Sequence, residues 1–254
     1  MSFMDKTPRQ QTPIAVRRDA VVTWIDADGN PQRARADKGL LHKKLYSAKM
    51  IRTGNRYPKQ RNYHGLNWFA NTQTHVWCES LFERHALLWL DFTCDIVKIA
   101  AQPMKISFGD GTHHTPDFMT RHADGRQVLY DVKPTRYLTG KALVQFEKTA
   151  EICKKIGWGY EVLSDLDPQV HINLDFLASF RHPAFAPPAE ERTRLLASMH
   201  GPMPLGELGP ILQMPAGEAR SSVYHLLWRR DLYLDLTQLM SSKTLTAKEP
   251  HAHA

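Results

Sequence analysis

The chain has 254 residues, is 42% hydrophobic and carries a formal charge of +7 at pH 7. A chain of this length and apolar content can bury one large domain, or a medium domain and a small one, so a wholly disordered protein is excluded. It has no run of about 18 apolar residues and no apolar leader at its start, so we expect a cytoplasmic protein without a membrane partner. Three scattered cysteines argue against a disulfide framework or a thiolate zinc site.

The positive charge is concentrated in residues 1–61, which hold 14 Lys and Arg against five Asp, so this segment has a net charge of +9 and the rest of the chain −2. Residues 1–20 are polar and predicted to be disordered, residues 21–36 to form a small hairpin, and the residues up to 61 to form a basic connector. We expect this arm to bind DNA phosphates, and a solvated, partly disordered arm is the alternative. The phosphate-binding side chains predicted here are Lys43, Lys44, Arg52, Arg56, Lys59 and Arg61.

A central domain is predicted over residues 62–182. Residues 75–92 form an apolar stretch without Gly or Pro, which predicts a buried helix of about five turns. Strands are predicted over 96–100, 104–108, 115–121 and 127–133, read together as an antiparallel meander. An amphipathic helix over 140–156 follows, ended by Gly157, and then a strand over 160–163. This order predicts an α/β fold with a mixed sheet flanked by helices.

A smaller domain is predicted over residues 190–240, after a Pro-rich linker at 183–189. Helices are expected over 190–199, 205–212 and 216–230, with a strand over 233–236, an arrangement that suggests a winged helix. Arg220, on the longest of these helices, is a further candidate for DNA binding, although so few cations there also fit a protein-docking role. Residues 241–254 are predicted to be an unstructured tail.

Two acids and a lysine fall on neighbouring predicted strands. Asp131 and Lys133 are two residues apart, so their side chains project from the same face of a strand. Asp117 opens the preceding strand, and antiparallel pairing brings it beside them if the register allows. A D-x-K pattern alone is common and on an exposed strand usually means solvated charges. The ordered set, with a helical glutamate upstream, is what points to a catalytic site.

That glutamate is Glu83, which a helical step of 100° per residue aligns with the apolar Leu87 and Leu90. A buried carboxylate raises its pKa or meets a cation. Oxygen ligands from Glu83, Asp117 and Asp131 suit Mg²⁺, with Mn²⁺ as a substitute, and two such ions are expected. Lys133 would orient or help deprotonate the attacking water, or stabilise charge in the transition state.

Three neighbouring residues are weaker candidates. Glu79 could contribute through water or be a solvated partner of a nearby base. Of the adjacent His113 and His114, at most one can face the site, and a phosphate contact or an exposed position is the favoured reading.

Residues 77–165 resemble the N-terminal nuclease domain of the TnsA family, the PD-(D/E)xK endonuclease subunits of heteromeric transposases. The matching segments are ESLFERHALLWLDF, Gln102-Pro103, HTPDF, YDVKP and GWGYEVLSD. The resemblance implies a restriction-endonuclease-like fold, a catalytic Glu83, a metal-binding Asp117 and a catalytic Lys133. The position that corresponds to Asp131 varies in that family.

The resemblance also implies partners and a reaction. The partners would be DNA, a DDE-type transposase subunit and an AAA+ ATPase regulator, and the reaction a cut in the non-transferred strand at the 5′ transposon ends. Two alternatives are a stand-alone PD-(D/E)xK nuclease of phage defence, restriction or DNA repair, and a catalytically inactive winged-helix DNA-binding regulator.

Overall fold

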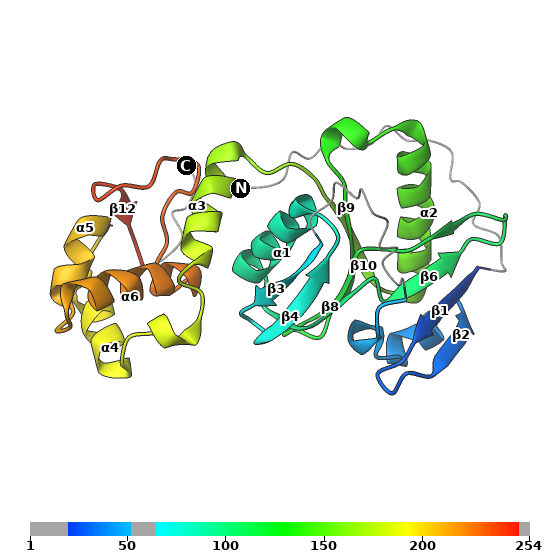
Figure 1. Ribbon diagram of the computed structural model, residues 1–254, viewed down its shortest axis with the longest axis horizontal. Helices are drawn as coiled ribbons and strands as arrows, with labels where there is room; N and C mark the ends of the chain where they lie inside the picture. Colours follow the sequence, from blue (N-terminus) through cyan, green and yellow to red (C-terminus); the bar gives the residue numbers. More distant parts are fainter. Residues whose placement is uncertain (1–19, 52–63, 249–254) are drawn as a thin grey trace. The chain divides into compact units, whose positions relative to one another are not determined.

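The computed structural model describes residues 20–51 and 64–248 (Figure 1). The chain forms two compact units, residues 1–165 and residues 166–254. The helices and strands of the first unit are β1 (Val21–Ile25), β2 (Pro31–Arg35), η1 (Lys38–His42), η2 (Leu45–Ser47), β3 (Gly65–Phe69), β4 (Thr74–Cys78), α1 (Leu81–Thr93), β5 (Ile96–Ala101), β6 (Met104–Ser107), β7 (His113–His114), β8 (Phe118–His122), β9 (Gln127–Val132), η3 (Thr135–Tyr137), α2 (Gly140–Ile156) and β10 (Gly159–Leu163).

A mixed sheet lies at the centre of this unit, with strand order β10-β9-β8-β5. β10 pairs with β9 in parallel, whereas β8 pairs with β9 and β5 antiparallel. Leu87 and Leu90 of α1 pack with one face of the sheet, and Ile152 and Ile156 of α2 belong to the core on the other face, together with Leu129 (Figure 1). The predicted α/β class with a mixed, helix-flanked sheet is therefore confirmed.

The expected helix over residues 75–92 is wrong in its first part. Residues Thr74–Cys78 are strand β4, which pairs antiparallel with β3, and helix α1 begins only at Leu81. Ser80 is the N-cap, and its hydroxyl oxygen accepts the Glu83 N–H, so the helix starts there. An apolar run fits a buried strand as well as a buried helix, and the buried Val76 packs in the same core from β4.

The expected antiparallel meander is also wrong in part, because β6 leaves it for a second sheet of order β2-β1-β6-β7. The predicted hairpin of β1 and β2 is present, but it is not a loose part of an arm: β1 pairs with β6, and Val22 and Trp24 are buried in the core of the unit. Residues 1–19 and 52–63 of the predicted arm and connector lie outside the described residues.

Helix α2 has the bounds that its sequence pattern predicted. It ends at Gly157, whose φ of 100° is the left-handed conformation that glycine adopts at low cost. Its buried face consists of Thr149, Ile152, Cys153 and Ile156, whereas the apolar Leu143 in its first half is 47% exposed. The first half of this helix therefore leaves apolar surface uncovered.

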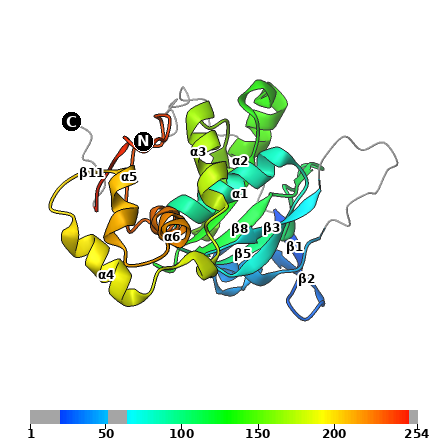
Figure 2. The ribbon, with the colours of Figure 1, turned by 60° about the vertical axis from the view of Figure 1, so that its left-hand side comes forward.

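The second unit is helical with one short ribbon (Figure 2). Its elements are α3 (Pro168–Ala178), η4 (Pro183–Phe185), α4 (Ala189–Ser198), β11 (Met203–Pro204), α5 (Leu205–Leu208), η5 (Gly209–Ile211), α6 (Ala216–Trp228) and β12 (Leu245–Thr246). Helix α3 was not predicted, and the division of the chain precedes it instead of following residue 182. Asn173 of α3 donates both amide hydrogens within the unit, to the carbonyl oxygens of Leu236 and Gln238 at 2.8 Å each.

The end of the second unit differs from the prediction. Residues 233–236 do not form a strand, since Tyr233 makes only an isolated bridge with Ala247. The ribbon consists of β11 and β12, so residues 241–248 are ordered and the predicted unstructured tail is wrong for them. Residues 249–254 lie outside the described part of the chain.

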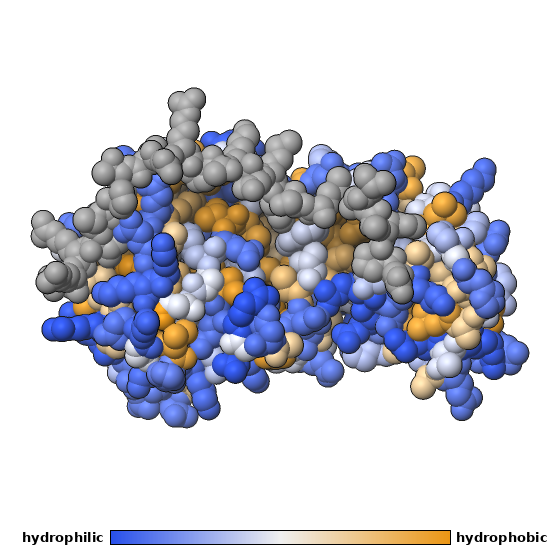
Figure 3. All heavy atoms as spheres, turned by 180° about the vertical axis from the view of Figure 1, so that it is seen from behind, coloured by the Kyte–Doolittle hydropathy of each residue, from blue (hydrophilic) through white to orange (hydrophobic). Residues whose placement is uncertain are grey.

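Hydrophilic side chains cover much of the face seen in Figure 3, and apolar ones occur in scattered groups. Within residues 20–51 and 64–248, the helices lack the combination of length and apolarity that a membrane crossing requires.

Candidate active site

Asp117 and Asp131 lie opposite each other on the central sheet. Phe118 of β8 pairs with Tyr130 of β9, and continuing this antiparallel register places Asp117 across from Asp131. The Asp117 carboxylate accepts a hydrogen bond of 2.7 Å from the Val132 N–H of β9. The register left open by the sequence is thus the one that brings the two carboxylates together.

The Asp117 carboxylate is held in an electrostatically unfavourable place. Burial raises its pKa well above the usual range, and the nearby Asp131, Glu83 and Glu79 carboxylates raise it further. The hydrogen bond from Val132 opposes these effects but does not cancel them. A carboxyl group surrounded by other acids is a place where a cation is favourable.

Asp131 is almost fully enclosed, with 2% exposure, and both of its oxygens are engaged. The Tyr160 hydroxyl donates to Oδ2 at 2.5 Å, and His114 Nε2 lies 3.0 Å from Oδ1. His114 Nδ1 lies in turn 2.9 Å from the Thr149 hydroxyl, which donates to the Gln145 carbonyl oxygen at 2.8 Å. We call these side chains, Asp131, His114, Tyr160 and Thr149, the Asp131 network.

Hydrogen-bond donors and acceptors fix the direction of this network. The Thr149 hydroxyl has one hydrogen, so when it donates to Gln145 it accepts a hydrogen from His114 Nδ1. The other ring nitrogen, His114 Nε2, faces Asp131 Oδ1, so the imidazole links Asp131 to Thr149 of α2.

Glu83 has two hydrogen-bond partners at the start of α1 that its sequence pattern did not predict. Its Oε2 accepts the Glu79 N–H at 2.8 Å, and its Oε1 accepts the Ser80 hydroxyl at 3.1 Å, so Glu83 helps to close the first turn of α1. Burial nevertheless raises the pKa of Glu83, as expected for an inward-pointing carboxylate, and the Glu79 carboxylate raises it further. Glu83 is both a helix-capping group and an electrostatic neighbour of Asp117.

Lys133 follows the end of β9 and is partly exposed. Its backbone N–H donates to the Leu163 carbonyl oxygen at 2.9 Å, which continues the parallel pairing of β9 and β10 and fixes the start of its side chain. In the described part of the chain no ion pair occupies its ammonium group. The amine is therefore available to a ligand.

Asp117, Asp131 and Glu83 do not yet form a closed ligand set. Among the described residues, they do not offer three oxygen atoms that all lie within 4.8 Å of one another. The capping contacts engage both oxygens of Glu83 at the start of α1, and Tyr160 and His114 engage both oxygens of Asp131. Direct ligation of one cation by all three carboxylates would need a change in these contacts.

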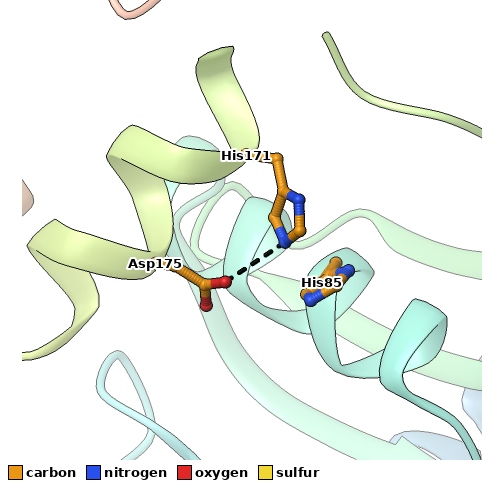
Figure 4. Close-up of side chains that lie close together, drawn as sticks. All are labelled: His85, His171 and Asp175. Atoms are coloured by element: carbon orange, nitrogen blue, oxygen red, sulfur yellow. Dashed lines mark ion pairs between the residues drawn. The ribbon is translucent and has the colours of Figure 1, made fainter. Parts of the chain in front are cut away.

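A pair of side chains on α3 belongs to the second unit. His171 Nε2 lies 3.2 Å from Asp175 Oδ2, one helical turn further on, and the pair is partly exposed (Figure 4). His85, also labelled there, lies on α1 of the first unit. With a protonated histidine, an i,i+4 pair of this kind stabilises a helix by about 0.2–0.5 kcal/mol.

The predicted phosphate-binding side chains are spread over the chain. Lys43 and Lys44 are exposed between η1 and η2 of the first unit, and Arg220 is exposed on α6 of the second. The remaining four, Arg52, Arg56, Lys59 and Arg61, lie outside the described residues.

Sequence reasoning missed the Asp131 network. His114 was expected to be exposed or to contact phosphate, but it is 6% exposed and contacts Asp131, while His113 is exposed. Strand alternation could have identified His114 only with the register of β6 and β7 known, and Tyr160 only with the parallel pairing of β10.

No protein-family model and no curated protein matches this chain.

Proposed function

We propose that the chain is a metal-dependent DNA endonuclease of the PD-(D/E)xK type with a restriction-endonuclease-like central domain. One observation carries the proposal: Asp117 lies across from Asp131, where its pKa is raised by burial and by the Asp131 and Glu83 carboxylates. Lys133 follows two residues after Asp131 on the same strand face. Carboxyl groups whose pKa is raised by burial and by neighbouring acids, close to a lysine in the sequence, are typical of functional sites.

The donor set fits Mg²⁺ or Mn²⁺, because every donor group in it is an oxygen. Asp117 and Asp131 would hold the metal, as one ion or two, and Glu83 would complete the set. When bound, the metal polarises a phosphoryl oxygen and acidifies a water molecule. A cation also reverses the repulsion felt by Asp117, which supports its placement there.

The other residues have roles that follow from their contacts. His114 and Tyr160 fix the orientation of Asp131, so they are positioning residues. Lys133 reaches the phosphate or the attacking water, where its ammonium group stabilises negative charge in the transition state or orients the water.

We further propose that the protein works as the TnsA-like subunit of a heteromeric transposase and cuts the non-transferred strand at the 5′ transposon ends. Its partners would be a DDE-type transposase and an AAA+ ATPase. In the second unit, α4, α5 and α6 with the β11–β12 ribbon are compatible with the winged helix expected of such subunits. A stand-alone nuclease with the same site is the second candidate.

Nicking of supercoiled plasmid in Mg²⁺ and in Mn²⁺ tests the nuclease. Wild type is compared with Asp117→Ala, Lys133→Ala and the control Lys98→Ala, which alters an exposed lysine of β5 in the same sheet. We expect metal-dependent nicking by wild type and by the control, and a loss of at least a hundredfold in the other two variants, with folding of each verified by circular dichroism.

Two results would sink the proposal. One is nicking of equal rate in all four proteins, which would point to a contaminant or another site. The other is absence of cleavage both alone and with the cognate transposase and its DNA ends. High activity of the purified chain by itself would favour the stand-alone nuclease over the transposase subunit.

A further inference from the structure

A cavity of about 420 Å³ lies between the β6–β7 region and the first half of α2. This volume falls in the range of about 300–1,000 Å³ that is usual for sites of small organic ligands. We call it the α2 cavity, and its lining residues are Phe108, Thr112, His113, Gly140, Lys141, Val144, Gln145 and Lys148.

The charged side chains that line the α2 cavity are lysines. Its lining contains two lysines and a histidine and no carboxylate. Lys148 donates to Asp110 Oδ2 at 2.5 Å and lies 5.5 Å from the centre of the Phe108 ring, so its position is fixed and its charge partly offset. Lys141 and His113 are exposed, and within the described chain neither has an ion-pair partner. The cavity therefore offers the Lys141 ammonium group and the His113 ring to an anion.

The cavity also has an apolar part. Val144 is 40% exposed although it is aliphatic, whereas Phe108, in the same lining, is only 2% exposed. A bare phosphate ion would leave this apolar surface without a partner. A nucleotide satisfies both parts, because it combines an anionic phosphate with the apolar faces of a sugar and a base.

Both walls of the α2 cavity connect directly to the Asp131 network. His113 precedes His114, and the Gln145 carbonyl oxygen accepts the Thr149 hydroxyl that contacts His114. Helix α2 itself begins at Gly140, seven residues after Lys133. The cavity therefore includes the residue next to His114 on β7, and His114 contacts Asp131.

We propose that the α2 cavity is a subsite for one nucleotide of the DNA strand bound by this nuclease, an inference that rests on the proposed function. Lys141 and His113 contact the phosphate, and Val144 contacts the sugar or base. The occupant is a nucleotide of the DNA polymer, recognised by shape and charge.

DNA binding without cleavage tests the subsite. The anisotropy of a labelled duplex with a single-stranded end is measured in EDTA, with full-length wild type, Lys141→Glu, Val144→Trp and Lys154→Glu. The Trp variant fills the cavity without changing charge. Lys154→Glu is the matched control, since it makes the same charge change at an exposed position of the same helix. Thermal unfolding of each variant verifies its fold.

We expect Lys141→Glu and Val144→Trp each to weaken binding at least tenfold and Lys154→Glu by less than about threefold. Removal of one phosphate contact in Lys141→Gln should also lower the slope of log affinity against log salt by about 1. Binding by Val144→Trp equal to wild type overturns the subsite, because surface attraction alone would then explain Lys141. An equal effect of Lys141→Glu and Lys154→Glu overturns it as well.

Two further comparisons distinguish a DNA subsite from a mononucleotide site and from a failure of the proposed nuclease activity. If wild type binds free deoxyadenosine monophosphate and Val144→Trp does not, while both bind DNA equally, the site serves a mononucleotide and the DNA subsite is overturned. Because these measurements need no hydrolysis, failure of the nuclease assay leaves the binding result intact. Conversely, cleavage with unaltered binding by both α2 cavity variants sinks the subsite alone.

Discussion

His114 Nε2 lies 3.0 Å from Asp131 Oδ1, although the two residues belong to strands of different sheets. His114 is on β7, which pairs with β6, and Asp131 is on β9 of the central sheet. The contact therefore ties the two sheets together at the candidate active site. It also means that the carboxylate on the D-x-K strand is oriented by residues outside that strand.

Tyr160→Phe tests how strongly the Asp131 network holds this carboxylate. The substitution removes the hydroxyl that donates to Asp131 Oδ2, and the loss of a hydrogen bond to a charged buried group should lower the free energy of unfolding by about 1.5–3 kcal/mol. Urea unfolding measures it, with Tyr137→Phe, at a 52% exposed tyrosine, as a control expected within about 0.5 kcal/mol of wild type.

A double-mutant cycle with Asp131→Asn separates this interaction from packing changes. The effect of Tyr160→Phe should become smaller in the Asn background, because the ionised acceptor is then absent. Additive effects of the two substitutions would contradict a direct interaction between Tyr160 and Asp131.

Ser80 and Glu83 allow the capping role of Glu83 to be separated from its proposed catalytic role. Ser80→Ala removes the N-cap acceptor of α1 and should cost about 1 kcal/mol of unfolding free energy. Glu83→Gln keeps an acceptor for the Glu79 N–H, so its stability should remain within about 0.5 kcal/mol of wild type. In the plasmid assay the order should reverse, with cleavage retained by Ser80→Ala and lost in Glu83→Gln. Equal losses of cleavage in both folded variants would mean that Glu83 acts only through the start of the helix.

Asp117→Asn should stabilise the protein in EDTA at neutral pH while abolishing metal-dependent cleavage. The folded state raises the pKa of Asp117 above its ordinary value of 3.8, so in this range the unfolded chain binds fewer protons than the folded one. Wild-type stability therefore falls as the pH rises from about 4 through the folded-state pKa, by about 1.4 kcal/mol for each unit of the shift. Asp117→Asn does not lose stability in this way, because its side-chain amide does not ionise.

Unfolding curves of both proteins from pH 4 to 8 measure the difference. The advantage of Asp117→Asn should be present at pH 7 and should shrink to near zero as the pH approaches 4. Addition of Mg²⁺ should reduce it at pH 7, because the cation stabilises only the carboxylate form. An advantage that does not change with pH would show that Asp117 does not carry a raised pKa.

Gly206 and Gly217 test the ordered end of the second unit. A Cβ on Gly206 would lie 2.9 Å from the Ser242 Cβ and 3.1 Å from its carbonyl oxygen, so Gly206→Ala should destabilise the protein by about 1–3 kcal/mol. Nothing lies within 4 Å of a Cβ on Gly217 of α6, so Gly217→Ala should stabilise by up to about 1 kcal/mol. Thermal unfolding measures both. A harmless Gly206→Ala would indicate that residues 241–248 do not pack against α5.

The sequence alone determined those features that depend on local pattern. Helix α2 was predicted with its bounds, because an amphipathic stretch that ends in Gly157 leaves few alternatives. The strands β1, β5, β6, β8 and β9 were found close to their positions, although β9 ends at Val132, one residue before Lys133. These features are decided by residues close together in the chain.

Tertiary structure decided what local pattern leaves open. The apolar run before Ser80 became strand β4, because its backbone found a partner in β3, and β6 left the expected meander because β1 was available to it. The same long-range pairing placed His114 and Tyr160 on Asp131 and set Asp117 across from it. Residue types and spacing name the candidate chemical groups, but hydrogen-bond register between distant strands determines which groups meet, and a shift of one residue would turn each side chain to the opposite face.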